Sequence, residues 1–234
     1  MSTKIIMQAR MSSSRLPGKV LMDIHGRPML SYLFEGLAKC KAVDGFLVAT
    51  SLEPSDDPVA EFCKREGVGC FRGDLRNVAQ RFLGAIKTEK LDSFVRICAD
   101  SPLLDYRIIE KGLSAFRKGE FDLVTNVQKR TYPRGMSVEV LDAKIFCGAY
   151  REFSEEGDFE HVTKFFYRHP ERFRIFNFEN EPPLPVVNLS VDTPEDMALV
   201  KEIIGRLDKP HWEYTAAELV ELRAELAGKD GTHG

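Results

Sequence analysis

Hydrophobic positions along the chain alternate between two kinds of segment. Short apolar runs are typical of strands buried in a parallel sheet, and the longer segments between them carry apolar residues on one helical face. This order predicts parallel βαβ units with right-handed crossovers and helices on both faces. The fold class is therefore α/β, with a doubly wound, mostly parallel sheet. The predicted strands span residues 5–8, 46–50, 69–71, 93–98, 121–126, 137–141, 173–178 and 186–191, and the predicted helices span residues 29–40, 58–66, 77–87, 106–118, 153–168, 194–207 and 215–226.

Capping residues support several of these helix boundaries. Asp56 or Asp57 precedes the helix at 58–66, and Thr193 precedes Pro194 at the start of the helix at 194–207. Side-chain oxygens at such positions accept hydrogen bonds from the first free amides of a helix. Asp196 is expected to interact with the positive end of the same helix.

Length and composition narrow the class of protein. With 234 residues and 43% hydrophobic content, the chain can form one large domain, which we place at 1–207, followed by a helical extension at 208–227 and a disordered polar tail at 228–234. The net charge of −3 gives no global attraction to nucleic acid. The sequence shows no signal peptide or membrane span. Its five cysteines form no CxxC pair, which argues against a disulfide framework or zinc knuckle and favours the cytoplasm.

Residues 8–19 carry the strongest functional signal. Gln8 ends the first predicted strand, and the loop at 9–19 after it holds Arg10, Arg15 and Lys19 among small hydroxylated residues and a Pro-Gly pair. Backbone N–H groups and fixed positive charge in such a loop can bind a polyanion. Neither the GxxxxGK[ST] spacing of a Walker loop nor the GxGxxG spacing of a dinucleotide fingerprint occurs here. We interpret the segment as a phosphate-binding loop; the alternative is a solvated basic loop.

Asp100 ends an apolar strand and precedes Ser101-Pro102. Ligands of doubly wound sheets bind beyond the carboxyl ends of strands, where both Asp100 and the loop at 9–19 are expected. Mg²⁺ prefers a few carboxylates together with substrate phosphates, so Asp100 is a candidate ligand. Its alternative role is to cap the helix at 106–118, although Asp105 could serve as that cap instead.

Several segments together resemble one enzyme family. The motifs AR at 9–10 and SRLPGK at 14–19 resemble the opening of the CTP-dependent sugar cytidylyltransferases, which include enzymes that activate 3-deoxy-manno-octulosonate and acylneuraminate. The likeness is strongest to the branch named after spore coat polysaccharide biosynthesis protein F. It continues, in the family's order, in VATS at 48–51, FRG at 71–73, VRICADSPL at 95–103, YPRGMSVEV at 132–140, HVT at 161–163 and VDTPED at 191–196.

This resemblance implies a nucleotide-diphospho-sugar transferase-like fold and a set of site residues. It implies that Asp192 joins Asp100 in binding Mg²⁺, the alternative for Asp192 being a capping role shared with Thr193. Arg134 and Glu139 fall where the family shapes its acceptor-sugar pocket, and Arg134 could equally be an exposed turn residue. The nucleotide-binding residues that it implies are Ala9, Arg10, Met11, Ser12, Ser13, Arg15, Lys19, Arg72 and Arg81.

Two of the implied residues have open alternatives. Arg81 is either a nucleotide ligand or a surface residue of the helix at 77–87. His161 is either a substrate-binding residue, able to act as a base, or a packed residue of the helix at 153–168. The segment at 75–78, LRNV, departs from the more acidic stretch of similar enzymes, so the base contacts are not defined.

The sequence thus predicts a Mg²⁺-dependent transfer of CMP from CTP to a sugar, which could be a 2-keto-sugar acid, with release of pyrophosphate. Lys19, Arg10 and Asp100 are the expected catalytic residues, and we expect a cytoplasmic homodimer with no nucleic-acid or membrane partner. Two alternatives stay open: a nucleotidyltransferase of the same fold with another base or another acceptor, and a non-catalytic nucleotide- or sugar-binding module.

Overall fold

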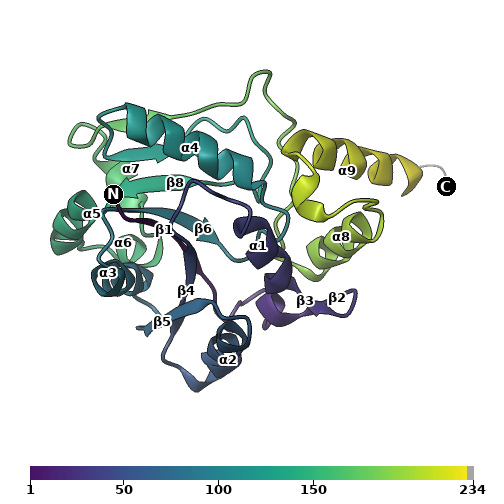
Figure 1. Cartoon of the computed structure of the whole chain (residues 1–234), viewed down its shortest axis with the longest axis horizontal. Helices are drawn as coiled ribbons and strands as arrows, with labels where there is room; N and C mark the ends of the chain where they lie inside the picture. The colour runs from purple at the N-terminus through teal and green to yellow at the C-terminus, as the bar shows by residue number, and fades with distance from the viewer. Residues whose placement is uncertain (231–234) are drawn as a thin grey trace.

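A seven-stranded sheet forms the centre of the protein (Figure 1). The computed structural model describes residues 1–230. The strand order is β5-β4-β1-β6-β8-β7-β9, and a small hairpin pairs β2 with β3. The strands are β1 (Thr3–Gln8), β2 (Asp23–Ile24), β3 (Arg27–Pro28), β4 (Phe46–Ser51), β5 (Gly69–Gly73), β6 (Ser93–Cys98), β7 (Leu123–Thr125), β8 (Glu139–Asp142) and β9 (Ile175–Asn177).

Helices cover both faces of this sheet, as the sequence predicts. They are α1 (Met29–Leu37), α2 (Asp57–Arg65), α3 (Val78–Glu89), α4 (Tyr106–Lys118), α5 (Ala143–Ala149), α6 (Glu156–Glu160), α7 (Lys164–Arg168), α8 (Pro194–Gly205) and α9 (Ala216–Asp230). Short 3₁₀ helices span Lys19–Leu21, Pro54–Asp56, Tyr150–Glu152 and His211–Glu213. Within the described residues, no helix is both long enough and apolar enough to span a bilayer.

The core consists of two hydrophobic clusters, one on each face of the sheet. Ile5 and Ile6 are adjacent in β1, yet Ile5 packs with α1, α4 and α8 while Ile6 packs with α3 and α5. Successive side chains of a strand point to opposite faces, so this division requires a sheet that is buried on both sides. The predicted fold class is confirmed. One strand departs from the predicted parallel pairing, because β8 runs antiparallel to both β6 and β7.

The predicted helix at 153–168 is wrong, since the chain breaks into α6 and α7. Arg168 Nη2 lies 2.7 Å from both carboxylate oxygens of Asp158, ten residues earlier. In one straight helix these residues would be about 15 Å apart along the axis. The break occurs at Val162, whose φ of 39° is unusual for a β-branched residue, and it leaves His161 exposed at the end of α6.

The predicted strand at 186–191 is also wrong. This segment is extended but makes only an isolated bridge, between Asn188 and Arg134. Its backbone groups bind loops rather than a strand: Arg134 N–H donates to Val187 O at 2.9 Å, and Val191 N–H donates to Asp100 O at 2.8 Å. The segment therefore connects the turn at 133–136 to the end of β6.

The C-terminal extension packs on the main domain. Ala216 and Leu219 of α9 belong to the same hydrophobic cluster as α1 and α4, and Ala216 N–H donates to the buried carboxylate of Asp105. Residues 228–230 of the predicted tail belong to α9, and its residues 231–234 lie outside the described part of the chain. The sequence pattern did not predict α5 or the β2–β3 hairpin, and the helix predicted at 29–40 ends at Leu37.

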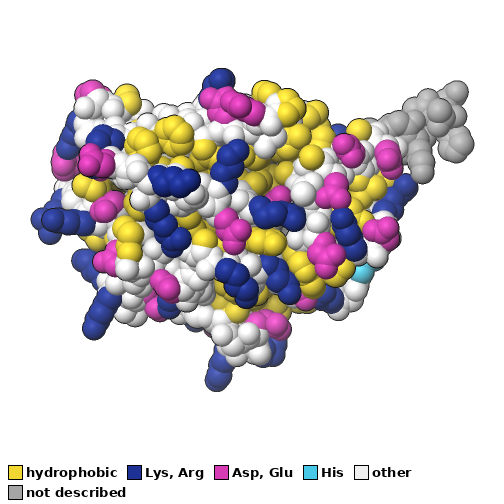
Figure 2. Space-filling view, turned by 45° about the horizontal axis from the view of Figure 1, so that its top comes forward, with side chains coloured by type: hydrophobic (Ala, Val, Ile, Leu, Met, Phe, Trp, Pro, Cys, Tyr) yellow, Lys and Arg dark blue, Asp and Glu magenta, His cyan; other side chains and the backbone are white. Residues whose placement is uncertain are grey.

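Figure 2 shows a face on which cationic and anionic side chains are interspersed. Positive charge is therefore not gathered over that face, in keeping with the nearly balanced composition of 33 basic and 36 acidic residues.

Candidate active site

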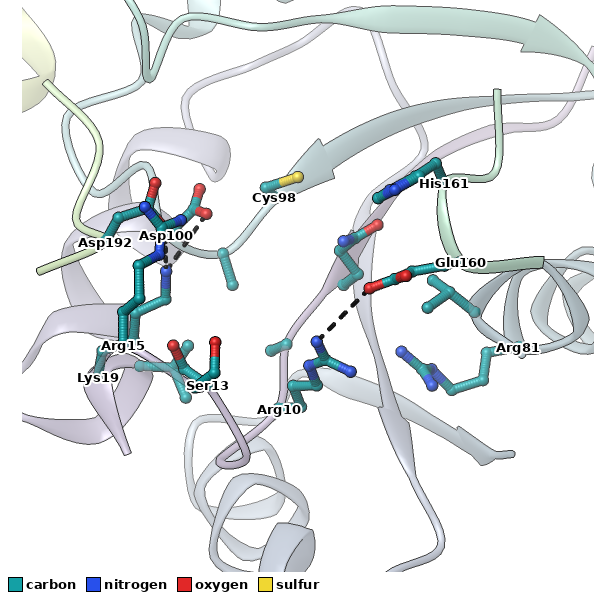
Figure 3. A pocket seen from close by; sticks show the side chains of 16 residues that line it. Arg10, Ser13, Arg15, Lys19, Arg81, Cys98, Asp100, Glu160, His161 and Asp192 are labelled. Carbon is teal, nitrogen blue, oxygen red and sulfur yellow. Dashed lines mark hydrogen bonds and ion pairs between the residues drawn. The ribbon is translucent and has the colours of Figure 1, made fainter. Parts of the chain in front are cut away.

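A cavity of about 360 Å³ lies at the carboxyl ends of β1 and β6 (Figure 3). We call it the first cavity. The loop at 9–19, the end of β6, the start of α3, the turn after α6 and the segment before α8 all contribute to it. The lining residues are Gln8, Ala9, Arg10, Ser13, Ser14, Arg15, Lys19, Val20, Val78, Arg81, Cys98, Ala99, Asp100, Glu160, His161 and Asp192.

The Met11 peptide organises the loop at 9–19. Its carbonyl oxygen accepts hydrogen bonds from Ser13 N–H at 3.0 Å and Gly18 N–H at 2.8 Å, so both ends of the loop close on one group. The amides of Ser14 and Arg15, which lie between them, donate to no acceptor in the part of the chain that the structure describes. These two N–H groups are therefore available to an anion, and the phosphate-binding role of the loop stays a prediction.

Lys19 lies at the centre of the acidic side of the cavity. Its side chain is 10% exposed, and Nζ donates to Val191 O at 2.6 Å, Asp192 Oδ1 at 2.9 Å and Asp100 Oδ2 at 3.5 Å. An ammonium group has three protons, so each has an acceptor. Lys19 is therefore the counter-ion of both carboxylates in this structure.

The charge of Asp192 is stabilised by these neighbours. Burial opposes its ionisation, but the hydrogen bond and charge of Lys19, together with Arg15, more than offset this effect and hold the pKa of Asp192 below its usual value. Arg15 Nη2 lies 3.1 Å from Asp192 Oδ1, and the Arg15 side chain is 63% exposed. Its guanidinium can consequently contact a ligand while paired.

Arg10 lies on the opposite side of the first cavity from Asp192 (Figure 3). Its Nη2 is 4.0 Å from Oε1 of Glu160, the last residue of α6, and His161 follows directly in the chain. His161 therefore lines the cavity. Its alternative role, a packed residue of a continuous helix at 153–168, is excluded. Met11 and Ser12 are not among the lining residues.

The capping alternatives for the two aspartates are excluded. Asp105 caps α4 by accepting from Arg107 N–H, so Asp100 is not that cap. Thr193 caps α8 and Asp196 accepts from the amides of Asp192 and Thr193, so the side chain of Asp192 is not the cap either. Both carboxylates instead converge on Lys19. Within the described residues, no group of three or more His, Cys, Asp or Glu side chains is placed to hold a metal ion.

Arg81 is buried, which excludes its interpretation as a surface residue. It is 1% exposed, and its Nη1 donates to the carbonyl oxygens of Asp74 and Leu75, holding the loop before α3. Burial, and next the charge of Arg10, lower the pKa of Arg81 to about 10. Arg81 lines the first cavity, but the structure does not bring Arg72 there. Arg72 Nη2 donates instead to Asp57 at 2.7 Å.

A second cavity, of about 340 Å³, adjoins the first. Its lining residues are Cys98, Asp100, Ser101, Arg130, Arg134, Gly135, Ser137 and Ser190, so the two cavities share Cys98 and Asp100. Gly135 has a φ of 91°, and a Cβ there would lie 2.8 Å from the Leu189 carbonyl carbon. Only glycine therefore fits the turn that presents Arg134.

Arg130 is a site residue that the sequence reasoning missed. Burial, and then the charge of Arg134, lower the pKa of Arg130, and its Nη1 donates to Ser137 Oγ at 3.3 Å. Two guanidinium groups thus face one cavity. The only sequence signal was its place four residues before Arg134, just ahead of the YPRG motif.

Glu139 does not line either cavity. It is 2% exposed and accepts hydrogen bonds from Arg96 and from the hydroxyl group of Tyr167. Burial, and next the charge of Glu139, raise the pKa of Tyr167. The structure therefore makes Glu139 the counter-ion of Arg96 and not a substrate-facing group, and corrects its expected role.

Comparison with known proteins agrees with this geometry. Residues 4–227 match the family model of the cytidylyltransferases. The chain is 30% identical over 228 residues to the spore coat polysaccharide biosynthesis protein SpsF of Bacillus subtilis (strain 168), which covers 93% of this chain and 92% of that protein.

Two solved structures share the fold. A cytidylyltransferase from Leptospira borgpetersenii serovar Hardjo-bovis (strain JB197) superposes with a TM-score of 0.92 at 28% identity, covering 100% of this chain and 98% of that one. A CMP:2-keto-3-deoxy-manno-octonic acid synthetase complexed with CTP gives a TM-score of 0.69 at 20% identity, covering 88% and 99%. The chain therefore belongs to the cytidylyltransferase family and is a nucleotidyltransferase, as its motifs predict.

Proposed function

We propose that this enzyme transfers CMP from CTP to a hydroxyl group of a sugar acid and releases pyrophosphate. The observation that carries the proposal is the shared wall of the two cavities at Asp100. One cavity offers a phosphate-binding loop and the other offers two arginines. Two substrates bound in them would meet at that wall, as in-line attack of a hydroxyl group on the α-phosphorus requires.

The first cavity suits the triphosphate. The guanidinium groups of Arg10 and Arg15 face it from two sides, and the amides of Ser14 and Arg15 are available as donors. Lys19 would neutralise charge developing on pyrophosphate where a phosphate oxygen replaces one of its present acceptors. The buried Arg81 adds positive charge and fixes the loop before α3, beside which the cytosine would bind.

The donor set fits a magnesium ion. Asp100 and Asp192 are carboxylates that already share one cation, Lys19, and phosphate oxygens would supply the remaining ligands. When bound, Mg²⁺ would polarise the phosphate and favour ionisation of the attacking hydroxyl group. The protein's part is to hold the two carboxylates at the shared wall and to align the triphosphate.

The second cavity suits an anionic acceptor. Arg134 and Arg130 face it together, and the lowered pKa of Arg130 reflects burial and a like charge nearby. A carboxylate would relieve that repulsion and accept paired hydrogen bonds. A 2-keto-sugar acid is therefore the preferred acceptor class. The synthetase of similar fold, which is named for such a substrate, gives further support.

The proposal is tested by incubating the purified protein with each of CTP, UTP, ATP and GTP, Mg²⁺ and a panel of sugar acids and neutral sugars, while pyrophosphate release is measured. CTP with an acidic sugar should give the highest rate. A preference for a purine triphosphate would contradict the cytidylyl assignment, and nucleotide binding without release with every acceptor would support a binding module. Cytoplasmic location and homodimeric assembly stay predictions.

A further inference from the structure

Two neighbouring aspartates after β4 have opposite surroundings. Asp56 is completely buried, whereas the side chain of Asp57 is 53% exposed and pairs with Arg72 at 2.7 Å. The sequence predicts that one of them caps α2, but no side-chain capping bond is formed at Asp56. The carboxylate of Asp56 must therefore have another role.

Asp56 joins the end of β4 to the phosphate-binding loop. Its Oδ1 accepts from Met11 N–H at 2.7 Å, and its Oδ2 accepts from Ser51 N–H at 3.2 Å and from the Ser51 hydroxyl group. A buried carboxylate is tolerated only when donors satisfy it, and hydrogen bonds to an ionised acceptor are stronger than neutral ones. Because its donors are neutral groups of β4 and the loop, Asp56 fixes these two segments to each other.

The bonded amide belongs to the peptide unit Arg10–Met11, next to the carbonyl group that closes the loop. Met11 O accepts from Ser13 N–H and Gly18 N–H, so a shift of Met11 moves both ends of the loop. The free amides of Ser14 and Arg15 lie between those ends. Their positions consequently depend on the bond from Met11 to Asp56, although Asp56 itself lines neither cavity.

We propose that Asp56 is a positioning residue that holds the phosphate-binding loop in the conformation that binds the triphosphate of the nucleotide. The inference rests on the proposed function only for the identity of the ligand. Asp56→Asn keeps the size of the side chain but replaces one acceptor oxygen with a donor, so it cannot satisfy both Met11 N–H and the Ser51 donors.

The experiment compares full-length Asp56→Asn with two matched controls. Asp57→Asn removes the neighbouring exposed charge, and Ser51→Ala weakens the same buried cluster on the side away from the loop. CTP affinity is measured by calorimetry with Mg²⁺ well below the melting temperature, and hydrogen exchange is measured for the loop at 9–19 and, as reference, for α4. Asp56→Asn should exchange faster in the loop alone and bind CTP about 10- to 100-fold more weakly, as expected for misplaced binding groups. Both controls should bind within about threefold of the parent.

Equal loss of CTP affinity in Asp56→Asn and Ser51→Ala would reduce Asp56 to a general stability role and overturn the proposal. So would unchanged loop exchange in a folded Asp56→Asn. If that variant does not fold, Asp56→Glu retains the charge and both acceptors in a longer side chain and is judged by the same two measurements. If the parent protein does not bind CTP but Asp56→Asn still speeds hydrogen exchange in the loop, the proposed function is contradicted. The role of Asp56 in holding the loop is then still supported.

Discussion

Lys19 Nζ lies 2.9 Å from Asp192 Oδ1, which makes the lysine of the phosphate-binding loop the partner of a carboxylate 173 residues away. The same ammonium group also contacts Asp100. The loop and the two carboxylates are thus one electrostatic unit before any ligand binds. A cation that enters between the carboxylates competes with Lys19 for them.

We expect Lys19→Ala to lower the rate of pyrophosphate release about 10²- to 10³-fold, the scale for losing one group that stabilises the transition state. The same variant should bind Mn²⁺, used as a probe for Mg²⁺, more tightly than the parent in the absence of nucleotide, because the carboxylates lose their counter-ion. Calorimetry and a pyrophosphate assay measure the two effects. A loss of less than tenfold in a folded protein would remove Lys19 from the mechanism, and unchanged Mn²⁺ affinity would contradict its role as a competing cation.

Asp100→Asn preserves the shape of the side chain and removes its charge. The Mg²⁺ concentration needed for half-maximal rate should therefore rise at least about tenfold, while CTP binding without metal persists or strengthens because repulsion of the phosphates falls. Ser101→Ala, which removes the 3.0 Å hydrogen bond to the same carboxylate, is the control and should have a small effect. Identical Mg²⁺ dependence in Asp100→Asn and the parent would show that Asp100 is not a ligand.

Arg134→Ala and Arg130→Ala should each raise the KM for an acidic acceptor, by about tenfold or more for a lost charged hydrogen bond to a carboxylate. The dissociation constant of CTP should stay within about threefold, because both arginines line only the second cavity. Arg206→Ala removes an exposed arginine at the C-terminal end of α8 that pairs with Glu202 and lines neither cavity, and it is the matched control. If both substitutions weakened CTP binding instead, the acceptor would not occupy the second cavity.

The lowered pKa of Asp192 predicts how the stability of the fold depends on pH. Its pKa is lowered in the folded protein by Lys19 and Arg15, so the ionised form stabilises the fold. This contribution is complete above the ordinary pKa of 3.8 and is lost as the pH falls through the lower folded value. Urea unfolding should therefore show the parent more stable than Asp192→Asn near neutral pH, with the difference shrinking below about pH 4. A difference that grew on acidification would contradict the assigned direction.

The sheet and most helices could be predicted because their signals are local. Apolar runs such as the one ending at Gln8 define buried strands, and Asp105 and Thr193 cap the helices for which they were considered. The break at Val162 could not be predicted, since it depends on the pairing of Arg168 with Asp158 across the turn. Periodicity alone is satisfied equally by one helix or by two.

The motif that follows β1 and the motif that ends β6 pointed to Lys19 and Asp100, and both line the first cavity. The prediction failed where a charged residue pairs with a residue of a distant segment. Glu139 and Arg72 are of the residue types expected of ligands, yet each has a partner within the protein. Glu139 pairs with Arg96, and Arg72 pairs with Asp57. Conversely, Arg130 lies in an unremarkable stretch and reaches the site only through the fold. Pairing between distant charges is a property of the tertiary structure and leaves no periodic pattern.

The wall at Cys98 and Asp100 has a consequence for inhibitor design. Consider a compound that joins a cytidine phosphate to an acidic group through a short linker. Once the cytidine phosphate is bound in the first cavity, the acidic group would lie beside the second cavity. The second contact then becomes intramolecular, with an effective concentration in the millimolar range for a short flexible linker, and overall affinity can exceed that of either half by about 10²- to 10⁴-fold. Burial raises the pKa of the Cys98 thiol to about 12, so a linker that passes over Cys98 meets a neutral side chain at physiological pH.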